Sequence, residues 1–326
     1  MLSRRKLLAA SGASGLMPFA ARAQETWPSR VIQMVVAFPP GGQADVAARP
    51  TAAALERVFG RAVPVVNRPG AGGILGSASV ARAAPDGYTA LMALSSLSVL
   101  PESERLMGRV PAYEVAQLAP VARITADPTV LLVSADAPWK TLEEFVSAAR
   151  AQPGRITYGS AGNYSTLHVA MAMLTGAAAI DLLHVPFQGG GPALTALLSD
   201  TIQALASGPG PALPHVQEGR LRALACWGRQ RIPGFEAVPT FIELGYREVE
   251  FYIWSGVFLP AATPAPVQEQ WRQALRLVCA EDAALQRALQ AAGSPLAYQD
   301  GEAFRQFMTE DTARLTRAVQ RIGRLD

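Results

Sequence analysis

The chain has 326 residues, of which 50% are hydrophobic, enough for two domains with buried cores. Its 29 basic and 26 acidic residues give a formal net charge of +3. Four of the basic residues (Arg4, Arg5, Lys6 and Arg22) precede a predicted cleavage site, and removing them from the 29 leaves 25 against 26, a net charge near −1. This balance excludes the basic field typical of nucleic-acid-binding and membrane-surface proteins.

Residues 1–23 are expected to be a secretory signal peptide. A basic start is followed by a mild apolar stretch, and Ala21-Arg22-Ala23 offers a small-x-small cleavage site. The adjacent Arg4 and Arg5 also fit a twin-arginine signal, so Sec and twin-arginine export both stay open. No later run is long and apolar enough to span a bilayer. We therefore expect a periplasmic protein, cleaved near Ala23.

The first predicted strand, 31–38, leads into a turn containing Pro40, Gly41 and Gly42, and a helix over 44–59 follows. Ligands bind at such strand-to-helix turns in open α/β sheets, and a helix start favours an anion. The alternative is an ordinary connection in which Asp45 only caps the helix.

The next elements also end at glycine- and serine-rich turns. A strand over 61–66 precedes 67–76, which nearly matches a dinucleotide fingerprint but has one residue too many before its last glycine and lacks the acidic residue expected about twenty positions on. It is interpreted instead as a turn opening a small-residue helix over 76–83. The third strand, 89–94, is followed by Ser95, which faces either a ligand or a helix end.

The middle of the chain alternates strands and helices. An apolar stretch over 118–133, broken at Asp127-Pro128, predicts a strand leaving one domain and a strand opening another. The remaining elements are a helix at 141–151, strands at 155–158, 182–187, 201–206 and 221–227, a helix at 167–174, and a helix that begins at Pro192. The alternation predicts an α/β chain with largely parallel sheets.

A second long apolar strand, 251–259, is a candidate return crossing, and residues 266–323 are mostly helical by pattern. We therefore expect a discontinuous first domain, 24–126 plus 251–326, and a second domain, 127–250, joined by two strands that act as a hinge.

Several chemistries were weighed against the residues present. Cys226 and Cys279 form either a disulfide or two buried thiols. The three histidines are scattered without metal-ligand spacing, so no metal and no cofactor is expected. Ser160, His168 and Asp45 supply the residue types of a hydrolase triad, but Ser160 lacks the Gly-x-Ser-x-Gly elbow.

Across nearly the whole mature chain, a set of short motifs keeps a shared order and spacing. They are Trp27-Pro28-Ser29-Arg30, Phe38-Pro39-Pro40-Gly41-Gly42 with Asp45 and Arg49, Asn67-Arg68-Pro69-Gly70-Ala71-Gly72-Gly73, Ala84-Pro85-Asp86-Gly87-Tyr88-Thr89, Ser160 with Gly162 and His168, His184-Val185-Pro186, Ala212-Leu213-Pro214-His215, Gly219-Arg220-Leu221-Arg222-Ala223-Leu224 and Val238-Pro239-Thr240. Together they resemble the Bug family, the periplasmic solute receptors (TctC-like) of tripartite tricarboxylate transporters.

The resemblance implies a type II periplasmic-binding-protein fold of the Venus-flytrap kind, which captures a small organic carboxylate (mono-, di- or tricarboxylate) for the membrane subunits of a transporter. It implies that the turns 40–45 and 160–166 clamp the carboxylate, partly through water. We expect a monomer. A periplasmic sensory adaptor that reports ligand occupancy to a membrane signalling protein is the alternative.

The candidate ligand-binding residues lie on the predicted turns. They are Pro40, Gly41, Gly42, Asp45, Ser95, Ser160, Gly162, Asn163, Ser165, Thr166, Phe187, Gln188 and Ser207. The family often has an acidic residue where this chain has Ser207, which argues against a ligand amine at that point. Pro50 departs from the family pattern and either kinks the first helix or delays its start.

Overall fold

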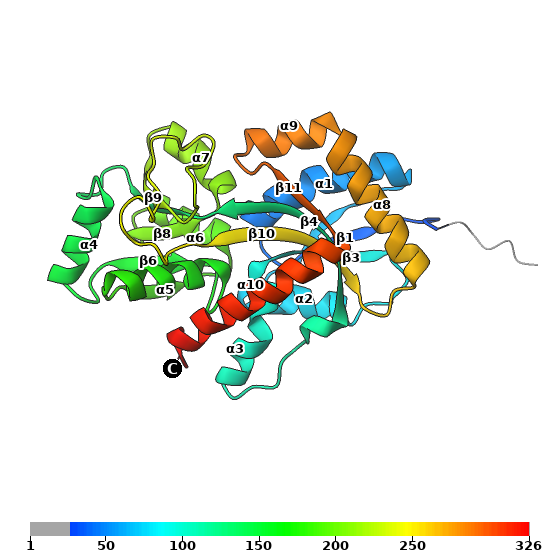
Figure 1. The fold of residues 1–326 in the computed structure, drawn as a ribbon, viewed down its shortest axis with the longest axis horizontal. Coiled ribbons are helices and arrows are strands. Elements are labelled where there is room, and N and C mark those ends of the chain that lie inside the picture. The colour runs from blue at the N-terminus through cyan, green and yellow to red at the C-terminus, as the bar shows by residue number, and fades with distance from the viewer. Residues whose placement is uncertain (1–26, 326) are drawn as a thin grey trace, which may run out of the picture.

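The computed structural model describes residues 27–325, so the expected signal peptide lies outside it. Within these residues the chain forms two lobes, each built on one mixed sheet with helices packed against it (Figure 1). The predicted α/β class with two lobes is therefore confirmed.

The first lobe holds a six-stranded sheet in the order β11-β4-β10-β3-β1-β2 within the described residues. Its strands are β1 (Gln33–Val36), β2 (Val65–Asn67), β3 (Thr89–Leu94), β4 (Leu118–Pro128), β10 (Tyr252–Pro260) and β11 (Leu296–Asp300). Its helices are α1 (Gln43–Phe59), α2 (Ile74–Ala81), α3 (Leu100–Leu106), α8 (Ala265–Glu281), α9 (Ala283–Ala291) and α10 (Gly301–Ile322), with short 3-10 turns η1 (Ala71–Gly73), η2 (Ser95–Ser98) and η3 (Val115–Gln117).

The second lobe holds a five-stranded sheet in the order β7-β6-β8-β5-β9, again within the described residues. Its strands are β5 (Val130–Ser134), β6 (Thr157–Ser160), β7 (Leu183–Pro186), β8 (Ala204–Ser207) and β9 (Leu221–Cys226). Its helices are α4 (Leu142–Ala151), α5 (Thr166–Ala178), α6 (Gly190–Leu198) and α7 (Pro209–Gln217).

Several sequence predictions need correction. The sheets are mixed rather than largely parallel, because β10 runs antiparallel to both β3 and β4, and β5 runs antiparallel to both β8 and β9. An edge strand, β11, was missed inside a stretch predicted to be helical; its half-buried residues pair with β4. Helix α6 begins at Gly190 rather than Pro192.

Pro50 does not delay the start of α1, because a single helix spans Gln43–Phe59 with Pro50 inside it. The next residue, Thr51, donates its hydroxyl to the carbonyl oxygen of Ala47 at 2.7 Å. This bond goes to the carbonyl next to that of Val46, which loses its helical donor at Pro50.

The chain crosses between the lobes on two adjacent strands. β4 ends at Pro128 and β5 begins at Val130, while the return crossing β10 pairs with β4 along almost its whole length. Trp254 on β10 is fully buried and donates its indole N–H to Asp311 of α10 at 2.7 Å. In Figure 1, α10 runs from the first lobe towards α5 of the second.

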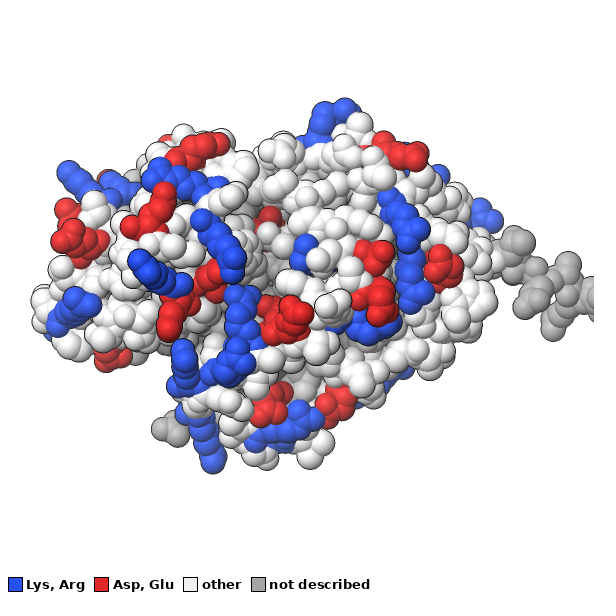
Figure 2. Space-filling view, in the orientation of Figure 1, with Lys and Arg blue, Asp and Glu red and all other residues white. Residues whose placement is uncertain are grey.

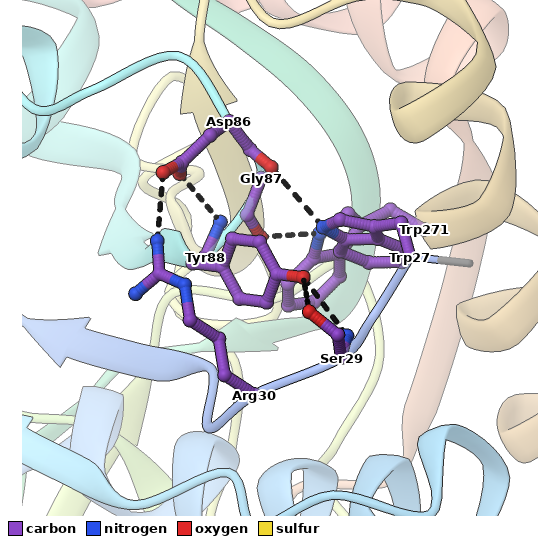
Figure 3. A network of polar contacts seen from close by, with 7 residues as sticks. All are labelled: Trp27, Ser29, Arg30, Asp86, Gly87, Tyr88 and Trp271. Atoms are coloured by element: carbon purple, nitrogen blue, oxygen red, sulfur yellow. Dashed lines mark hydrogen bonds and ion pairs between the residues drawn. The ribbon is translucent and has the colours of Figure 1, made fainter. Parts of the chain in front are cut away.

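The chain segment that starts the fold is fastened to the first lobe (Figure 3). The indole of Trp27 donates to the carbonyl oxygen of Asp86 at 3.1 Å, and that of Trp271 to Gly87 at 3.0 Å. Arg30 forms an ion pair with Asp86 at 2.8 Å and lies over the Tyr88 ring. The first and fourth motifs of the family resemblance thus contact each other.

Candidate functional site

The first candidate turn connects β1 to α1 and is held by one carboxylate. Asp45, which is 5% exposed, accepts hydrogen bonds from the Gly41 N–H, from Asn67 and, in bidentate fashion, from Arg49 at 2.7 and 2.9 Å. Burial opposes ionisation of Asp45, but these hydrogen bonds outweigh it and lower its pKa. Its oxygens are thereby occupied within its own lobe, and Arg49 is the structural partner of an acid.

The second candidate turn connects β6 to α5. The hydroxyl of Ser160, which is fully buried, donates to the Gly162 carbonyl oxygen at 3.0 Å and lies 2.6 Å from His184 Nε2. His168 accepts the Tyr164 N–H on Nδ1 at 3.0 Å and stacks on His184. Burial lowers the pKa of His184 to about 4, so its ring is neutral at pH 7.

This arrangement does not form the hydrolase triad that was weighed from the sequence. His168 caps the backbone of its own loop, Asp45 is bound to Arg49 in the other lobe, and the imidazole beside Ser160 belongs to His184. His184 was missed because 24 residues separate it from Ser160; only the pairing of β6 with β7, which sets Tyr158 opposite His184, brings the two together.

The turns of the two lobes meet in close contact along a seam. A Cβ on Gly189 would lie 2.4 Å from the Pro39 ring, one on Gly191 3.0 Å from the Pro40 carbonyl oxygen, and one on Gly162 3.2 Å from the Gly72 nitrogen. Residues without a side chain therefore allow the lobes to approach this closely. The structure is a closed conformation.

A small cavity of about 30 Å³ lies inside this seam. It is lined by Phe38, Gly42, Gln43, Ala44, Leu94, Ala161, Thr166, Leu167, Gly190, Ser207, Gly208, Pro211 and Ile253. These include first-turn residues of four helices, α1, α5, α6 and α7, in the described part of the chain. The starts of helices from both lobes, with the positive ends of their dipoles, therefore lie around one small cavity, although α7 contributes Pro211, which has no N–H.

Three buried hydroxyls in the turns have no hydrogen-bond partner among the described residues, and one of them lines the cavity. Thr166 lines the cavity and is 3% exposed, while Ser165 and Ser95 are completely buried; the side-chain oxygen of each lacks a partner among the described residues. Buried polar groups are usually hydrogen-bonded, so these hydroxyls are available to a ligand or to water.

The predicted site residues fall into five groups. Gly42, Thr166 and Ser207 line the cavity. Gly162, Asn163, Phe187 and Gln188 line an outer groove of about 270 Å³ between the lobes. Ser95 and Ser165 are buried beside the turns, Asp45 and Ser160 are bonded within them, and Pro40 and Gly41 are exposed.

Gln43 is the cavity-lining polar residue that sequence reasoning missed. It directly follows Gly41-Gly42 and begins α1, so its place as the first helical residue after the glycines was a usable signal. The apolar lining residues Phe38, Leu94, Leu167 and Ile253 were also missed as site residues, because a core strand and a cavity wall have the same sequence pattern.

Charged side chains lie at the outer groove, which Glu104 and Arg109 line, rather than at the cavity. Among the described residues, no lysine or arginine lines the cavity, and Figure 2 shows acidic and basic side chains intermixed over the face it draws. No group of histidine, cysteine, aspartate and glutamate that could hold a metal ion occurs in residues 27–325. Cys226 and Cys279 are both buried and free, so the two-thiol alternative is correct.

None of the helices in residues 27–325 combines the length and apolar character needed to cross a lipid bilayer.

Comparison with known proteins places the chain in context. The profile of the tripartite tricarboxylate transporter family receptor (TctC) matches residues 47–324. Protein BugT of Bordetella pertussis is 36% identical over 241 residues, 73% of each chain. An uncharacterised-family protein (UPF0065) from the gbd 5′ region of Cupriavidus necator is 33% identical over 276 residues, 84% of this chain and 83% of its own.

Solved structures agree with the fold. The periplasmic binding protein BugD has a TM-score of 0.84 at 27% identity, covering 90% of this chain and 98% of its own. Rhodopseudomonas palustris MatC with bound malate gives 0.84 at 28% identity, covering 90% and 100%. An R. palustris protein with adipate gives 0.85 at 25%, covering 92% and 100%. The periplasmic-binding-protein fold is confirmed.

Proposed function

Because the chain belongs to the TctC family of tripartite tricarboxylate transporter receptors, we propose that it captures a small organic carboxylate between its two lobes. The observation that carries this proposal is the convergence of four helix starts, from both lobes, on one cavity without a basic side chain among the described residues that line it. Fixed N–H groups and unpartnered hydroxyls suit a carboxylate, which accepts several hydrogen bonds.

Thr166, Ser165 and Ser95 are proposed to donate hydroxyls to the ligand, and the turn at Gly42 to donate backbone N–H groups. Asp45 and Ser160, with their bonds inside their own turns, are proposed to position these turns rather than to touch the ligand directly. The outer-groove residues Phe187 and Gln188 then contact the far end of a longer ligand.

Hydrogen bonds and helix starts together can supply the free energy that carboxylate binding requires. Micromolar affinity requires about −8 kcal/mol. Four to six hydrogen bonds to a carboxylate supply roughly 1.5–3 kcal/mol each, and each helix start adds about 0.3–1 kcal/mol, before the losses from association and ordering. An arginine is therefore not required.

Capture requires the lobes to open. A cavity of about 30 Å³ has roughly the volume of one liquid water molecule, so an organic acid enters only when the seam separates. We propose the domains 24–126 plus 251–326, and 127–250, as the moving bodies, with β4 and β10 as the hinge; the separate sheets of the two lobes support this division.

We further propose export to the periplasm, monomeric function, and delivery of the ligand to membrane subunits of a tripartite transporter; the family membership supports the last step. Binding is tested by a thermal-shift screen of the purified mature protein against mono-, di- and tricarboxylates, aromatic acids and amino acids, followed by calorimetry. We expect one carboxylate class to raise Tm and its amide or alcohol counterparts to fail. No carboxylate binding, or turnover of a bound acid, would overturn the proposal.

A further inference from the structure

Gln43 is the first residue of α1 and its side chain reaches into the seam. It is 6% exposed, and its amide nitrogen donates to Asp127 Oδ2 at 2.7 Å and to Ser294 Oγ at 2.9 Å. Ser294 donates its hydroxyl to the same Asp127 oxygen. Three side chains, from the start of α1, the end of β4 and the segment before β11, thus form one buried network.

This network fixes which end of the Gln43 amide faces the cavity. The amide nitrogen of Gln43 faces Asp127 and Ser294, and above the pKa of Asp127 its ionised carboxylate can only accept hydrogen bonds, which keeps the nitrogen on that side. The carbonyl oxygen is then left on the cavity side, where it is buried without a hydrogen-bond partner among the described residues. It lies against Gly208 of the second lobe, since a Cβ on Gly208 would be 2.2 Å from it.

A buried carbonyl oxygen needs a donor, and no group among the described residues donates to this one. Leaving such an acceptor unpaired is unfavourable, whereas a ligand that donates to it restores the bond. The other side chains of the lining are mostly apolar, and no aspartate or glutamate among the described residues lines the cavity. A hydroxyl therefore suits this point better than an ammonium group, whose charge would lack a neighbouring carboxylate.

We propose that Gln43 is a specificity-determining residue that selects carboxylates carrying a hydroxyl group over their deoxy counterparts. The proposal rests on carboxylate capture at this cavity and adds to it the chemical class of the ligand. Asp127 acts as a positioning residue, because it holds the Gln43 amide in the orientation that presents the oxygen.

The test compares matched pairs of acids by calorimetry: lactate against propionate, 3-hydroxybutyrate against butyrate, and malate against succinate. Binding is measured at pH 8, above the pKa of Asp127, which burial raises to about 7. We expect the wild-type protein to bind the hydroxy acid of at least one pair about tenfold more tightly, as a buried hydrogen-bonding site discriminates.

Two variants separate the proposed role from a general loss of folding. Gln43→Met keeps the side-chain length but removes the acceptor, and should reduce the preference to about onefold while the deoxy acid still binds. Asp127→Asn places an amide beside Gln43 that can bond to either end of the Gln43 amide. It should lower the preference for the hydroxy acid, but by less than Gln43→Met does. Gln152→Met, at an exposed position in the loop after α4, is the matched control and should keep the wild-type ratio.

A wild-type protein that binds the acids of every pair equally, or a Gln43→Met variant with the wild-type ratio, would refute the role of Gln43 while leaving carboxylate capture intact. Failure of every acid to bind the wild-type protein would instead overturn the proposed function, and this inference with it. If Gln43→Met does not fold, as judged by its circular dichroism, an unchanged ratio in Asp127→Asn would refute the positioning.

Discussion

Substitution of Gly208 tests whether the closed seam is needed for binding. Gly208 has φ −63° and ψ 152°, a conformation that alanine adopts without strain. In the closed conformation, however, the new Cβ would lie 2.2 Å from the Gln43 carbonyl oxygen and 2.7 Å from the amide carbon. Gln43 cannot simply turn away, because Asp127 and Ser294 hold its amide.

The size of the effect follows from this overlap. Carbon and oxygen atoms in contact are about 3.3–3.6 Å apart, so Gly208→Ala requires the surfaces to separate by about 1 Å. Overpacking of this kind costs about 1–3 kcal/mol, and we expect carboxylate affinity to fall by about 5- to 150-fold. The free protein should fold normally, since the clash exists only across the seam.

Calorimetry measures the affinity, and small-angle scattering with a saturating carboxylate measures closure. Gly176→Ala is the control: it lies inside α5, where an added Cβ meets no atom within 4 Å, and should stabilise the protein by about 0.5–1 kcal/mol without changing affinity. The double variant Gln43→Ala, Gly208→Ala should close again. A Gly208→Ala protein with wild-type affinity and scattering would refute the reasoning.

Three further predictions concern single side chains. Asp45→Asn removes the charged partner of Arg49 and should lower the free energy of unfolding in urea by about 1–3 kcal/mol. Because the pKa of Asp45 is lowered, the extra stability of the wild-type protein should be present at neutral pH and should vanish as pH falls below about 4. A difference in stability that persists at pH 2 would contradict this. Burial raises the pKa of Asp127 from 3.8 to about 7, so its contribution to stability is complete below about pH 4 and is lost as pH rises to about 7. Asp127→Asn should therefore flatten the dependence of the free energy of unfolding on pH between these values. A dependence on pH equal to that of the wild-type protein would count against this prediction. Tyr164 donates its hydroxyl to the Gly323 carbonyl oxygen and accepts the Leu325 N–H, so Tyr164→Phe should cost about 1–2 kcal/mol and speed carboxypeptidase trimming; unchanged trimming would show that these bonds do not hold the C-terminal segment.

Sequence patterns predicted those parts of the fold that depend on interactions between residues close in the chain. The glycine turn before α1 and the cap of α4, where Thr141 accepts the Glu144 N–H, follow from residues within a few positions. The ion pair of Arg49 is equally local, since four residues on a helix bring it onto Asp45.

Long-range pairing decided what local patterns missed. The antiparallel direction of β10 follows from its return between lobes, and β11 exists because β4 offers an unpaired edge. Likewise, Gln43 faces Ser294 across 251 residues, and His184 reaches Ser160 only through sheet register. Such contacts depend on tertiary structure, which no window of sequence contains.

The proposed use of helix dipoles in place of cations has a consequence for the conditions under which the receptor works. In physiological buffers, salt screens the attraction between exposed charges over a distance of about 8–10 Å, but it has much less effect on groups that are buried away from solvent. A receptor built this way would hold its guest almost equally well in dilute and in saline surroundings, which suits a compartment whose ionic content follows the outside medium.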